Sequence, residues 1–511
     1  MNKDVLKKIK KIQQLADIVA HCKRQGKKVV HCHGVFDLLH PGHLKHFESA
    51  KKKGDVLVVT VTPDEHVNRG PGRPIFNQDL RAESIAHLAC VDFVAINEWP
   101  TAVEAIKTIR PDFYIKGSEY AIKEDDVTGK IFDEEEAVKK VGGQLDFTDD
   151  ITFSSTSIIN DLLAPYPEEA QDFLKSLKKR YSTEDIIRYL QGVRSVKVLV
   201  IGDVIIDEYH YCVGMAKTQK DNIIATRFIS AEQFAGGVLA AANHIAGFCK
   251  DVTLLSCIGT GENYQPFITD RLKPNIQTKF YQRKDAPTVV KRRFVDKNFL
   301  TKLFEICYLD DLTMLPTSVE NKICDYLRKN LKKFDMVLVA DFGHGMITPK
   351  IIKILCEKAK FLALNVQTNS SNIGFNLVPK FPRADYICID EPELRFACHD
   401  RFSKPEDLVL KITKKMKCDH MIITRGHRGA LTYSKKKGFS QIPVFSKEVI
   451  DRIGAGDAFF SITSPCIFKG VPTEVVGVIG NAVGAMKVLI VGNRASVEPA
   501  PLLKYIGTLL K

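Results

Sequence analysis

The chain has 511 residues, 45% hydrophobic and 26% charged, a composition typical of a globular protein with room for two or three domains. Its formal net charge is +13, but Lys and Arg are spread along the chain without a nucleic-acid-binding motif, so small anionic substrates are expected rather than nucleic acid. Thirteen cysteines, an odd number without C-x-x-C spacing, argue against a disulfide framework or a zinc ribbon and indicate reduced thiols, as in a cytoplasm.

The sequence predicts no membrane partner. Residues 1–28 have a Lys-rich helical periodicity but lack the apolar core of a signal peptide. The most apolar run, 475–491, is rich in Gly and Ala and is interrupted by Asn481 and Lys487, so it predicts a buried helix. We therefore expect a soluble, cytoplasmic protein.

The first part of the chain alternates short apolar runs with amphipathic stretches. This alternation predicts a Rossmann-like, doubly wound parallel sheet of the α/β class. The expected strands are 28–33, 55–62, 93–97, 113–116 and 144–148, and the expected helices are 15–24, one that begins near residue 42, 78–88, 103–109 and 133–140.

The stretch 31–43 reads His-Cys-His-Gly-Val-Phe-Asp-Leu-Leu-His-Pro-Gly-His and joins the first strand to a helix. A strand, a glycine-containing turn and a helix N-terminus form a site where α/β proteins hold phosphate. His40 and His43 are three residues apart and can face one anion, which suits a phosphorus centre that gains negative charge. Two alternatives stay open at this point: a metal site among the five histidines of this region, or histidines with structural partners only.

The run from Gly34 to His43 resembles the H-x-G-H signature of the cytidylyltransferase-like nucleotidyltransferases. The resemblance implies in-line attack of a substrate phosphate on the α-phosphorus of a nucleoside triphosphate, with release of pyrophosphate and with Mg²⁺ bridging the phosphates. It makes His40 and His43 catalytic hydrogen-bond donors. The other residues that it assigns to nucleotide or phosphate binding are Gly34, Phe36, Asp37, Arg73, Arg81, Lys116, Ser155 and Thr156.

Local patterns leave alternatives for some of these residues. Arg73 lies in the Gly/Pro-rich loop 69–74 and by itself is a solvated loop charge. The hydroxyl-rich segment 154–157 by itself is a helix N-cap.

Lys116 begins a Lys-Gly-Ser-Glu-Tyr segment that resembles the Lys-Gly-x-x-Tyr of heptose-1-phosphate adenylyltransferases.

Two prolines within residues 164–169, followed by charged helical segments, indicate a domain boundary. We expect a nucleotidyltransferase domain over 1–163, a linker with a helix over 164–194, and a second domain over 195–511. The second domain again alternates strands and helices. Its expected strands are 198–201, 252–258, 336–340, 361–366, 386–389 and 421–424, and a helix is expected over 238–248.

Near the C-terminus, Gly454-Ala455-Gly456-Asp457 opens an apolar helix. Consecutive N–H groups there form an anion hole beside one carboxylate, which suits transfer of a γ-phosphoryl group to an alcohol. An N-cap Asp in a glycine turn is the local alternative.

The motif Asp-x-x-Gly-Ala-Gly-Asp, 451–457, resembles the C-terminal signature of the ribokinase-like (PfkB) carbohydrate kinases, and 195–511 follows that family's order of motifs. The resemblance implies a doubly wound parallel sheet with a small β lid, Asp457 as the base, and ATP as phosphoryl donor. It assigns Gly454, Ala455 and Gly456 to the anion hole, Thr424, Gly426 and Gly429 to the nucleotide loop, and Asp207, Gly236, Gly237 and Lys291 to the sugar side.

The second domain departs from the family pattern at three places. Ala240 stands where Asn is usual, Asn365-Val366-Gln367 replaces Asp-Pro-Lys, and Asp390 replaces the Asn of the Asn-x-x-Glu motif, in which Glu393 is kept. Asp390 and Glu393 are the expected Mg²⁺ ligands. These departures leave open an inert kinase domain that serves as a scaffold.

Together the halves resemble the bifunctional enzymes of ADP-heptose synthesis, with the domain order reversed. The resemblance implies a kinase for a sugar or sugar phosphate and a nucleotidyltransferase that uses ATP or CTP on a sugar phosphate, for surface glycans. By analogy with ribokinase-like lids, a homodimer is expected. The alternatives are a cytidylyltransferase for an alditol or glycerol phosphate with a divergent kinase domain, and a non-enzymatic nucleic-acid-binding protein suggested by charge alone.

Overall fold

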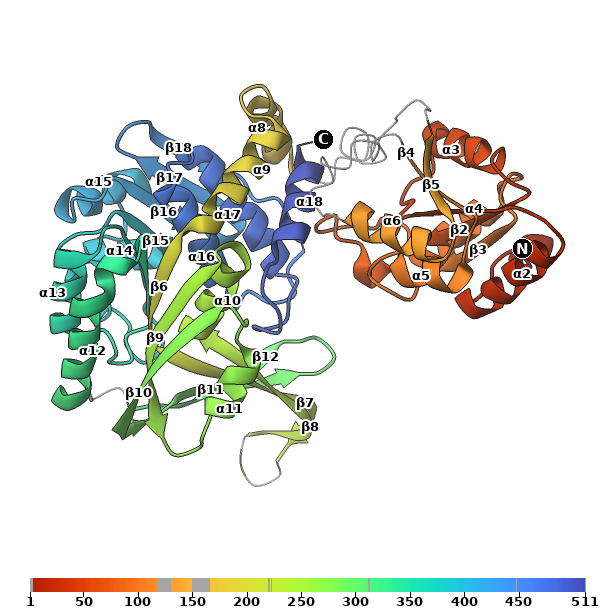
Figure 1. Ribbon diagram of the computed structural model, residues 1–511. Helices are drawn as coiled ribbons and strands as arrows, with labels where there is room; N and C mark the ends of the chain where they lie inside the picture. The colour runs from red at the N-terminus through yellow and green to blue at the C-terminus, as the bar shows by residue number, and fades with distance from the viewer. Residues whose placement is uncertain are drawn as a thin grey trace. The chain divides into compact units, whose positions relative to one another are not determined.

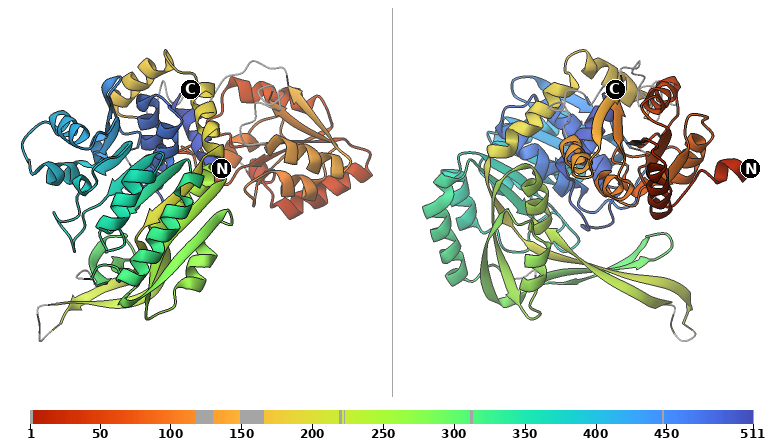
Figure 2. Two further views of the ribbon diagram at one scale, coloured as in Figure 1. Left: turned by 60° about the vertical axis from the view of Figure 1, so that its left-hand side comes forward. Right: turned by 45° about the vertical axis from the view of Figure 1, so that its right-hand side comes forward.

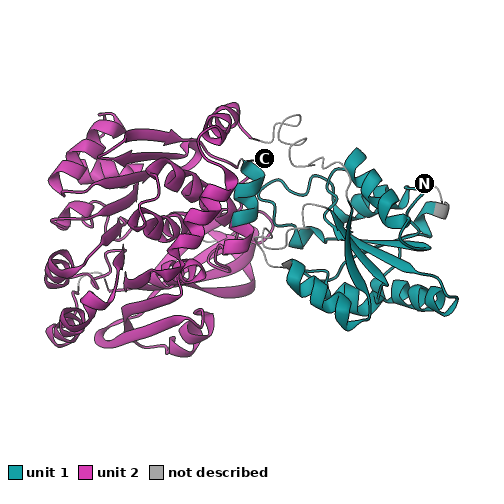
Figure 3. Ribbon diagram, turned by 45° about the horizontal axis from the view of Figure 1, so that its top comes forward, with its two compact units in different colours: residues 1–165, 503–511 teal, residues 166–502 magenta. Residues whose placement is uncertain are grey.

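The computed structural model describes residues 3–117, 130–148, 166–218, 221, 223–310, 313–446 and 448–510. The chain forms two compact units, residues 1–165 with 503–511, and residues 166–502 (Figure 3). The segment 164–194, expected as a linker with a helix, contains the helices α8 (Glu168–Lys178) and α9 (Thr183–Gly192), which belong to the second unit.

The first unit is built on a five-stranded sheet in the order β3-β2-β1-β4-β5, in which every neighbouring pair is parallel (Figure 1). The expected doubly wound parallel sheet is therefore confirmed. Its strands are β1 (Val29–Gly34), β2 (Val56–Val61), β3 (Phe93–Ile96), β4 (Phe113–Gly117) and β5 (Gln144–Thr148), and its helices are α1 (Lys3–Leu6), α2 (Ile12–Arg24), α3 (Pro41–Lys51), α4 (Gln78–Ala86), α5 (Val103–Ile109) and α6 (Lys130–Lys140).

Helices cover both faces of this sheet. Val30 and Cys32 of β1 pack with Phe47 of α3 and residues of α4, whereas Val29 packs on the opposite face with α2 and α5. Because both faces are buried, β2 is almost continuously apolar rather than alternating, and the first four residues of β1 are all buried. The chain runs from β1 to β2 on one side and later returns to β4 on the other, so the carboxyl end of β1 is a topological switch point.

The second unit has a nine-stranded sheet in the order β10-β9-β6-β13-β14-β15-β16-β17-β18. The pairs from β10 to β16 are parallel, as expected, and β17 and β18 add an antiparallel hairpin at one edge that the sequence pattern did not predict. The strands are β6 (Lys197–Gly202), β9 (Asp251–Thr260), β10 (Ile276–Pro287), β13 (Met336–Asp341), β14 (Leu362–Val366), β15 (Tyr386–Asp390), β16 (His420–Thr424), β17 (Ala430–Ser434) and β18 (Gly438–Ile442).

The helices of this unit lie on both faces of the large sheet. Apolar residues of α12, α13, α14 and α15 form one continuous core with the strands, while α10, α16 and α17 pack together elsewhere on the sheet. The run expected as a buried helix is α17, and most of its side chains are buried. The bounds are α10 (Val238–Phe248), α11 (Gln265–Arg271), α12 (Thr317–Asn330), α13 (Pro349–Lys358), α14 (Glu391–Cys398), α15 (Pro405–Lys415), α16 (Ala455–Phe468) and α17 (Thr473–Lys487). The last helix, α18 (Pro499–Leu509), is divided between the two units, since residues from Leu503 onward belong to the first.

A separate four-stranded sheet, in the order β12-β11-β7-β8, stands apart from these layers and is the expected β lid (Figure 2). It consists of β7 (Val204–Lys217), β8 (Ile224–Gly237), β11 (Val289–Asp296) and β12 (Lys302–Tyr308). Among the helices of the described ranges, none is long and apolar enough to cross a membrane.

Candidate active sites

The loop after β1 and the first turn of α3 contain the two histidines of the first signature. Gly34 has to be glycine, because a Cβ atom there would lie 2.8 Å from the Phe36 ring. Phe36 has a φ of 51°, and its ring packs 5.0 Å from that of Phe47 and 5.3 Å from that of His43. This packing fixes the loop at the switch point of the sheet, where ligands of α/β proteins bind.

His40 and His43, which are expected to face one anion, lie side by side. Their rings are stacked with centroids 3.9 Å apart, and His40 is the N-cap of α3. Burial lowers the pKa of His40 and, together with the neighbouring histidines, lowers the pKa of His43 to about 3. Both imidazoles are therefore neutral near pH 7, and each carries one N–H that can be donated to a phosphate held at the helix N-terminus.

The other histidines of this region have hydroxyl partners. His31 Nε2 lies 2.7 Å and His33 Nδ1 2.8 Å from Thr60 Oγ1, and His46 Nδ1 lies 2.9 Å from Thr148 Oγ1. In the part of the chain that the structure describes, no group of His, Cys, Asp or Glu is arranged to hold a metal ion. The structural alternative thus describes these three histidines.

Asp37 and Arg73 hold the loop that follows β2. The Asp37 carboxylate accepts hydrogen bonds from the N–H groups of Ile75 at 2.7 Å and Phe76 at 3.3 Å, and Arg73 lies 3.4 Å from it. The Arg73 side chain is only 3% exposed, so it is not a solvated loop charge. A phosphate that reaches Arg73 would compete with Asp37 for the guanidinium.

Arg81 of α4 is 1% exposed, and its guanidinium binds groups within the protein. It donates to the carbonyl oxygens of Val35, Thr62 and Phe76 and to Asp64, at 2.5 to 2.9 Å. These contacts join the loop after β1 to the segment that follows β2 and to the residue before the N-cap of α4. Arg81 is therefore a positioning residue. Direct binding of phosphate by Arg81 stays a prediction.

We expect Arg81→Met to lower the free energy of unfolding of the first unit by about 3 kcal/mol, because buried carbonyl groups lose their donor. Trp99 is the single tryptophan of the chain and belongs to this unit, so its fluorescence during urea denaturation reports on this unit alone. The exposed Arg188→Met in the second unit is the matched control and should leave the tryptophan transition unchanged.

Lys116 is the last residue but one of β4, which pairs with the signature strand β1. Its ammonium pairs with Glu134 at 2.9 Å and lies 5.4 Å from the centre of the Tyr114 ring. Ser155 and Thr156, and residues 118–120 of the segment that Lys116 begins, lie outside the described residues. Their assignment to the phosphates stays a prediction.

In the second unit, Asp457 lies in the first turn of α16. The N-cap of this helix is Gly454, which has a φ of 75°. Burial raises the pKa of Asp457 to about 6, and the carboxylate of Asp207 acts in the same direction. Gln367 lies directly after β14 and donates from Nε2 to Asp457 Oδ1 at 2.6 Å. The arrangement places a carboxylate of raised basicity beside the N–H groups of a helix N-terminus, at the carboxyl end of the sheet.

Gln367 is a residue whose role the sequence did not reveal. In the sequence it is visible only as a departure from the family pattern. Its Nε2 also donates to Asn365 Oδ1 at 2.7 Å, and Asn365 donates to the carbonyl of Cys388 at 2.8 Å. This chain of hydrogen bonds orients Asp457 from the neighbouring strands.

Asp207 of β7 faces the same site from the lid. Its carboxylate pairs with Arg293 at 2.5 Å, and Asn493 donates to it at 3.3 Å. A Cβ atom on Gly236 would lie 2.1 Å from Asp207 Oδ2, so glycine is required there, and Gly237 is the N-cap of α10 with a φ of 57°. Arg293 and Asn493 are further residues of this site that the sequence did not single out.

Lys291 of β11 lies next to Asp207 in the strand register and is 8% exposed. Within the described ranges, its ammonium has no hydrogen bond or ion pair, and its charge lowers the pKa of Asp457. A buried cation without a partner is suited to bind an anionic group of a ligand.

The expected nucleotide loop follows β16. Thr424 is paired in register with Asp390, and a Cβ atom on Gly429 would lie 2.0 Å from the carbonyl oxygen of Ile442. Gly426 begins the short helical turn between them, with a φ of 57°. The loop is thus held at the carboxyl ends of β15 and β16.

Asp390 and Glu393 form a capping box at the start of α14. Glu393 accepts from the N–H groups of Asp390 at 2.9 Å and Thr368 at 3.1 Å, and Asp390 Oδ1 accepts from the N–H of Glu393 at 2.8 Å. Burial raises the pKa of both carboxyl groups, that of Glu393 to about 8. Two adjacent carboxylates with raised pKa values fit a divalent cation that arrives with nucleotide phosphates, since Mg²⁺ commonly takes few protein ligands.

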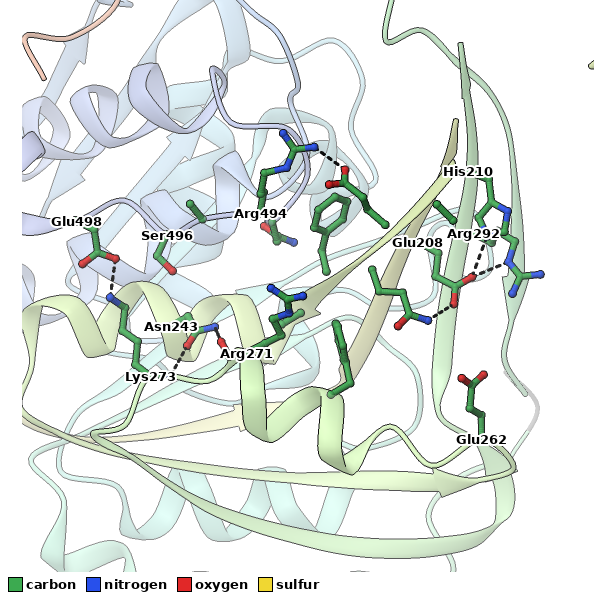
Figure 4. Close-up of a pocket in the computed structure, with 18 residues that line it drawn as sticks. Glu208, His210, Asn243, Glu262, Arg271, Lys273, Arg292, Arg494, Ser496 and Glu498 are labelled. Atoms are coloured by element: carbon green, nitrogen blue, oxygen red, sulfur yellow. Dashed lines mark hydrogen bonds and ion pairs between the residues drawn. The ribbon is translucent and has the colours of Figure 1, made fainter. Parts of the chain in front are cut away.

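A pocket of about 830 Å³ lies beside the lid strands β7 and β8 (Figure 4). Asn493, which donates to Asp207, is part of its wall. Most cations of the wall are paired with acids: Lys273 with Glu498, Arg292 with Glu208, and Arg494 with Glu232.

Comparison with known proteins divides the chain in the same way. Residues 195–500 match the family model described as pfkB family carbohydrate kinase, and residues 31–161 match the model described as cytidylyltransferase-like. The crystal structure of phosphofructokinase-2 from Escherichia coli in complex with potassium covers 62% of this chain and 100% of its own, with a TM-score of 0.50 and 12% identity. That similarity shows the fold of the second unit.

Curated relatives carry the name Bifunctional protein HldE. The one from Geobacter sulfurreducens is 38% identical over 165 residues, 32% of this chain and 32% of that protein. The one from Aliarcobacter butzleri is 42% identical over 139 residues, 27% of this chain and 29% of that protein. The chain therefore spans about a third of the length of the curated relatives it matches.

Proposed function

The chain belongs to the pfkB family of carbohydrate kinases and carries a cytidylyltransferase-like domain before its kinase domain, and from this premise we propose that it is a bifunctional enzyme of nucleotide-sugar synthesis. The kinase domain phosphorylates a sugar or sugar phosphate with ATP. The first domain transfers a nucleotidyl group from ATP or CTP to a sugar phosphate and releases pyrophosphate. Both reactions use Mg²⁺.

One observation carries the proposal. Each unit brings its candidate reactive side chains to a helix N-terminus at the carboxyl end of a parallel sheet, the histidine pair in the first unit and Asp457 in the second. Such a position stabilises the negative charge that grows at a phosphorus centre. The name of the HldE relatives, bifunctional protein, agrees with two activities in one chain.

In the kinase domain, Asp457 takes the proton from the attacking hydroxyl group, and the N–H groups of Gly454, Ala455 and Gly456 hold the transferred phosphoryl group. Asp207 orients the sugar. Lys291 binds a phosphate already present on the sugar, because its buried ammonium lies next to Asp207. Asp390 and Glu393 would hold the Mg²⁺ that neutralises the nucleotide phosphates.

In the transferase domain, no covalent intermediate is needed, so the site acts by positioning and charge stabilisation. His40 and His43 donate hydrogen bonds to the α-phosphate as charge develops on it. Lys116 and Arg73 exchange their present partners, Glu134 and Asp37, for ligand phosphates.

Pyrophosphate release by the purified protein tests the transferase reaction. Mg²⁺ is supplied with ATP or CTP singly and with a panel of sugar-1-phosphates and polyol phosphates. Release with a heptose-1-phosphate and ATP as the one good pair would support an ADP-heptose-like product. Absence of release with every pair, from folded protein, would contradict the assignment of His40 and His43.

The second candidate is a cytidylyltransferase for an alditol or glycerol phosphate with an inert kinase domain. The replacements at Asn365, Gln367 and Asp390 favour it, because they change residues next to the kinase site. A preference for CTP in the same panel, together with no phosphoryl transfer to any sugar, would support this candidate.

We further propose a cytoplasmic homodimer joined through the lid. All thirteen cysteines are unpaired, which agrees with a reducing compartment. The lid exposes large apolar side chains, among them Ile224 at 73%, Phe228 at 57% and Phe304 at 52%. Exposed apolar surface of this kind is typical of protein interfaces.

A further inference from the structure

The ammonium group of Lys487 is buried inside the kinase domain. Lys487 is the last residue of α17 and is 0% exposed. Its Nζ donates to the carbonyl oxygens of Ile453 at 2.9 Å and Gly492 at 2.5 Å. Removal of an ammonium from water is costly, and backbone carbonyl groups offset this cost only in part, so such a residue marks a place where a fixed charge is used.

Lys487 lies under the turn that begins α16. A Cβ atom on Gly454, the N-cap, would lie 3.3 Å from Lys487 Cε. Ile453, whose carbonyl the ammonium binds, directly precedes that glycine. The aliphatic part of Lys487 thus supports the turn from inside the protein.

Lys487 binds the carbonyl groups of Ile453 and Gly492, and Asp451 binds the N–H groups of these two residues. Asp451 Oδ1 accepts from the N–H of Ile453 at 3.1 Å, and Oδ2 accepts from the N–H of Gly492 at 2.8 Å. Lys487 and Asp451 therefore hold both polar groups of Ile453 and both of Gly492. These four hydrogen bonds connect the turn at Ile453 and Gly454 to Gly492, in the segment after α17.

We propose that Lys487 is a positioning residue of the phosphoryl-transfer site, whose ammonium fixes the turn at Ile453 and Gly454 and places an internal positive charge beneath the anion hole. This inference rests on the proposed kinase function. It deepens that function, because it assigns to a side chain of the protein itself the positive charge at these carbonyl groups.

The surroundings of Lys487 are consistent with a charged ammonium at neutral pH. Burial and the charge of Lys302 lower its pKa, and the carboxylates of Asp451, Asp457 and Asp207 raise it, with a result of about 8. His244, also close to Lys487, is neutral because burial lowers its pKa to about 3. The ammonium therefore loses its proton as the pH rises through about 8.

Lys487→Met tests the inference, since Met keeps the length of the side chain and removes the charge. We expect kcat of the kinase to fall by about 10²-fold, as for a reacting group that is slightly misplaced, with a smaller change in KM for the sugar phosphate. Lys469→Met is the matched control. It removes one exposed ammonium at the C-cap of α16, the end of this helix away from Gly454, and should leave kcat unchanged. Pyrophosphate release by the first domain reports that the variant chain is folded there, and thermal unfolding reports on the rest.

Two further measurements do not depend on how Lys487→Met folds. In Lys487→Ala, ammonium or potassium chloride should restore part of kcat by occupying the vacated space, whereas choline chloride should not. In the wild-type enzyme, kcat should decline as the pH rises through about 8. An unchanged kcat in Lys487→Met, or a wild-type profile that stays flat well above pH 8, would overturn the inference, whereas a wild-type protein without kinase activity would contradict the proposed function instead.

Discussion

Replacement of Asp457 by Asn is expected to lower kcat of the kinase by about 10²–10⁴-fold, the usual contribution of a general base. Asn keeps the volume of the side chain and can still accept the hydrogen bond that Gln367 Nε2 donates to Oδ1. It cannot take the proton of the attacking hydroxyl group. Coupled detection of ADP with a sugar phosphate as acceptor measures the effect, and pyrophosphate release by the first domain serves as the internal control.

The pH dependence of the same reaction adds a second readout. Asp457 acts as a base only when deprotonated, and its pKa is raised to about 6, mainly by burial. The kinase rate should therefore be lost as the pH falls through about 6. Gln367→Leu should move this midpoint to higher pH, because the hydrogen bond from Gln367 stabilises the charged carboxylate. Equal kinase rates in wild type and Asp457→Asn would support the inert kinase domain.

Replacement of His43 by Ala is expected to lower kcat for pyrophosphate release by about 10²–10³-fold, as for loss of one donor to a developing oxyanion. The donor would be lost from the N-terminal turn of α3, where the stacked imidazoles face the expected phosphate. The KM for the nucleoside triphosphate should change less, since backbone N–H groups at the helix start still bind the ground state.

His46→Ala is the matched control for this prediction. His46 lies on the same helix one turn later, and its imidazole is bound to Thr148. A loss of pyrophosphate release equal to that of His43→Ala would show that the effect comes from the packing of the helix rather than from a donor. The kinase rate should be unchanged in both variants.

The sequence by itself determined the class of the fold and the position of the candidate reactive groups. Helices expected over 103–109 and 238–248 are α5 and α10, with the same bounds. The N-terminal ends of α3 and α16 contain the expected histidine pair and Asp457. This succeeded because strand and helix periodicities, glycine turns and helix starts are local properties of a few neighbouring residues.

Only the tertiary structure decided which charged side chains act together. Arg73 and Arg81 are buried and bound to the protein, although their sequence surroundings are polar loops and a helix start. Gln367 meets Asp457 across 90 residues of chain, and Lys487 reaches Ile453 across 34. The partners of a buried charge are set by the packing of distant elements, and no local pattern of residue types encodes that packing.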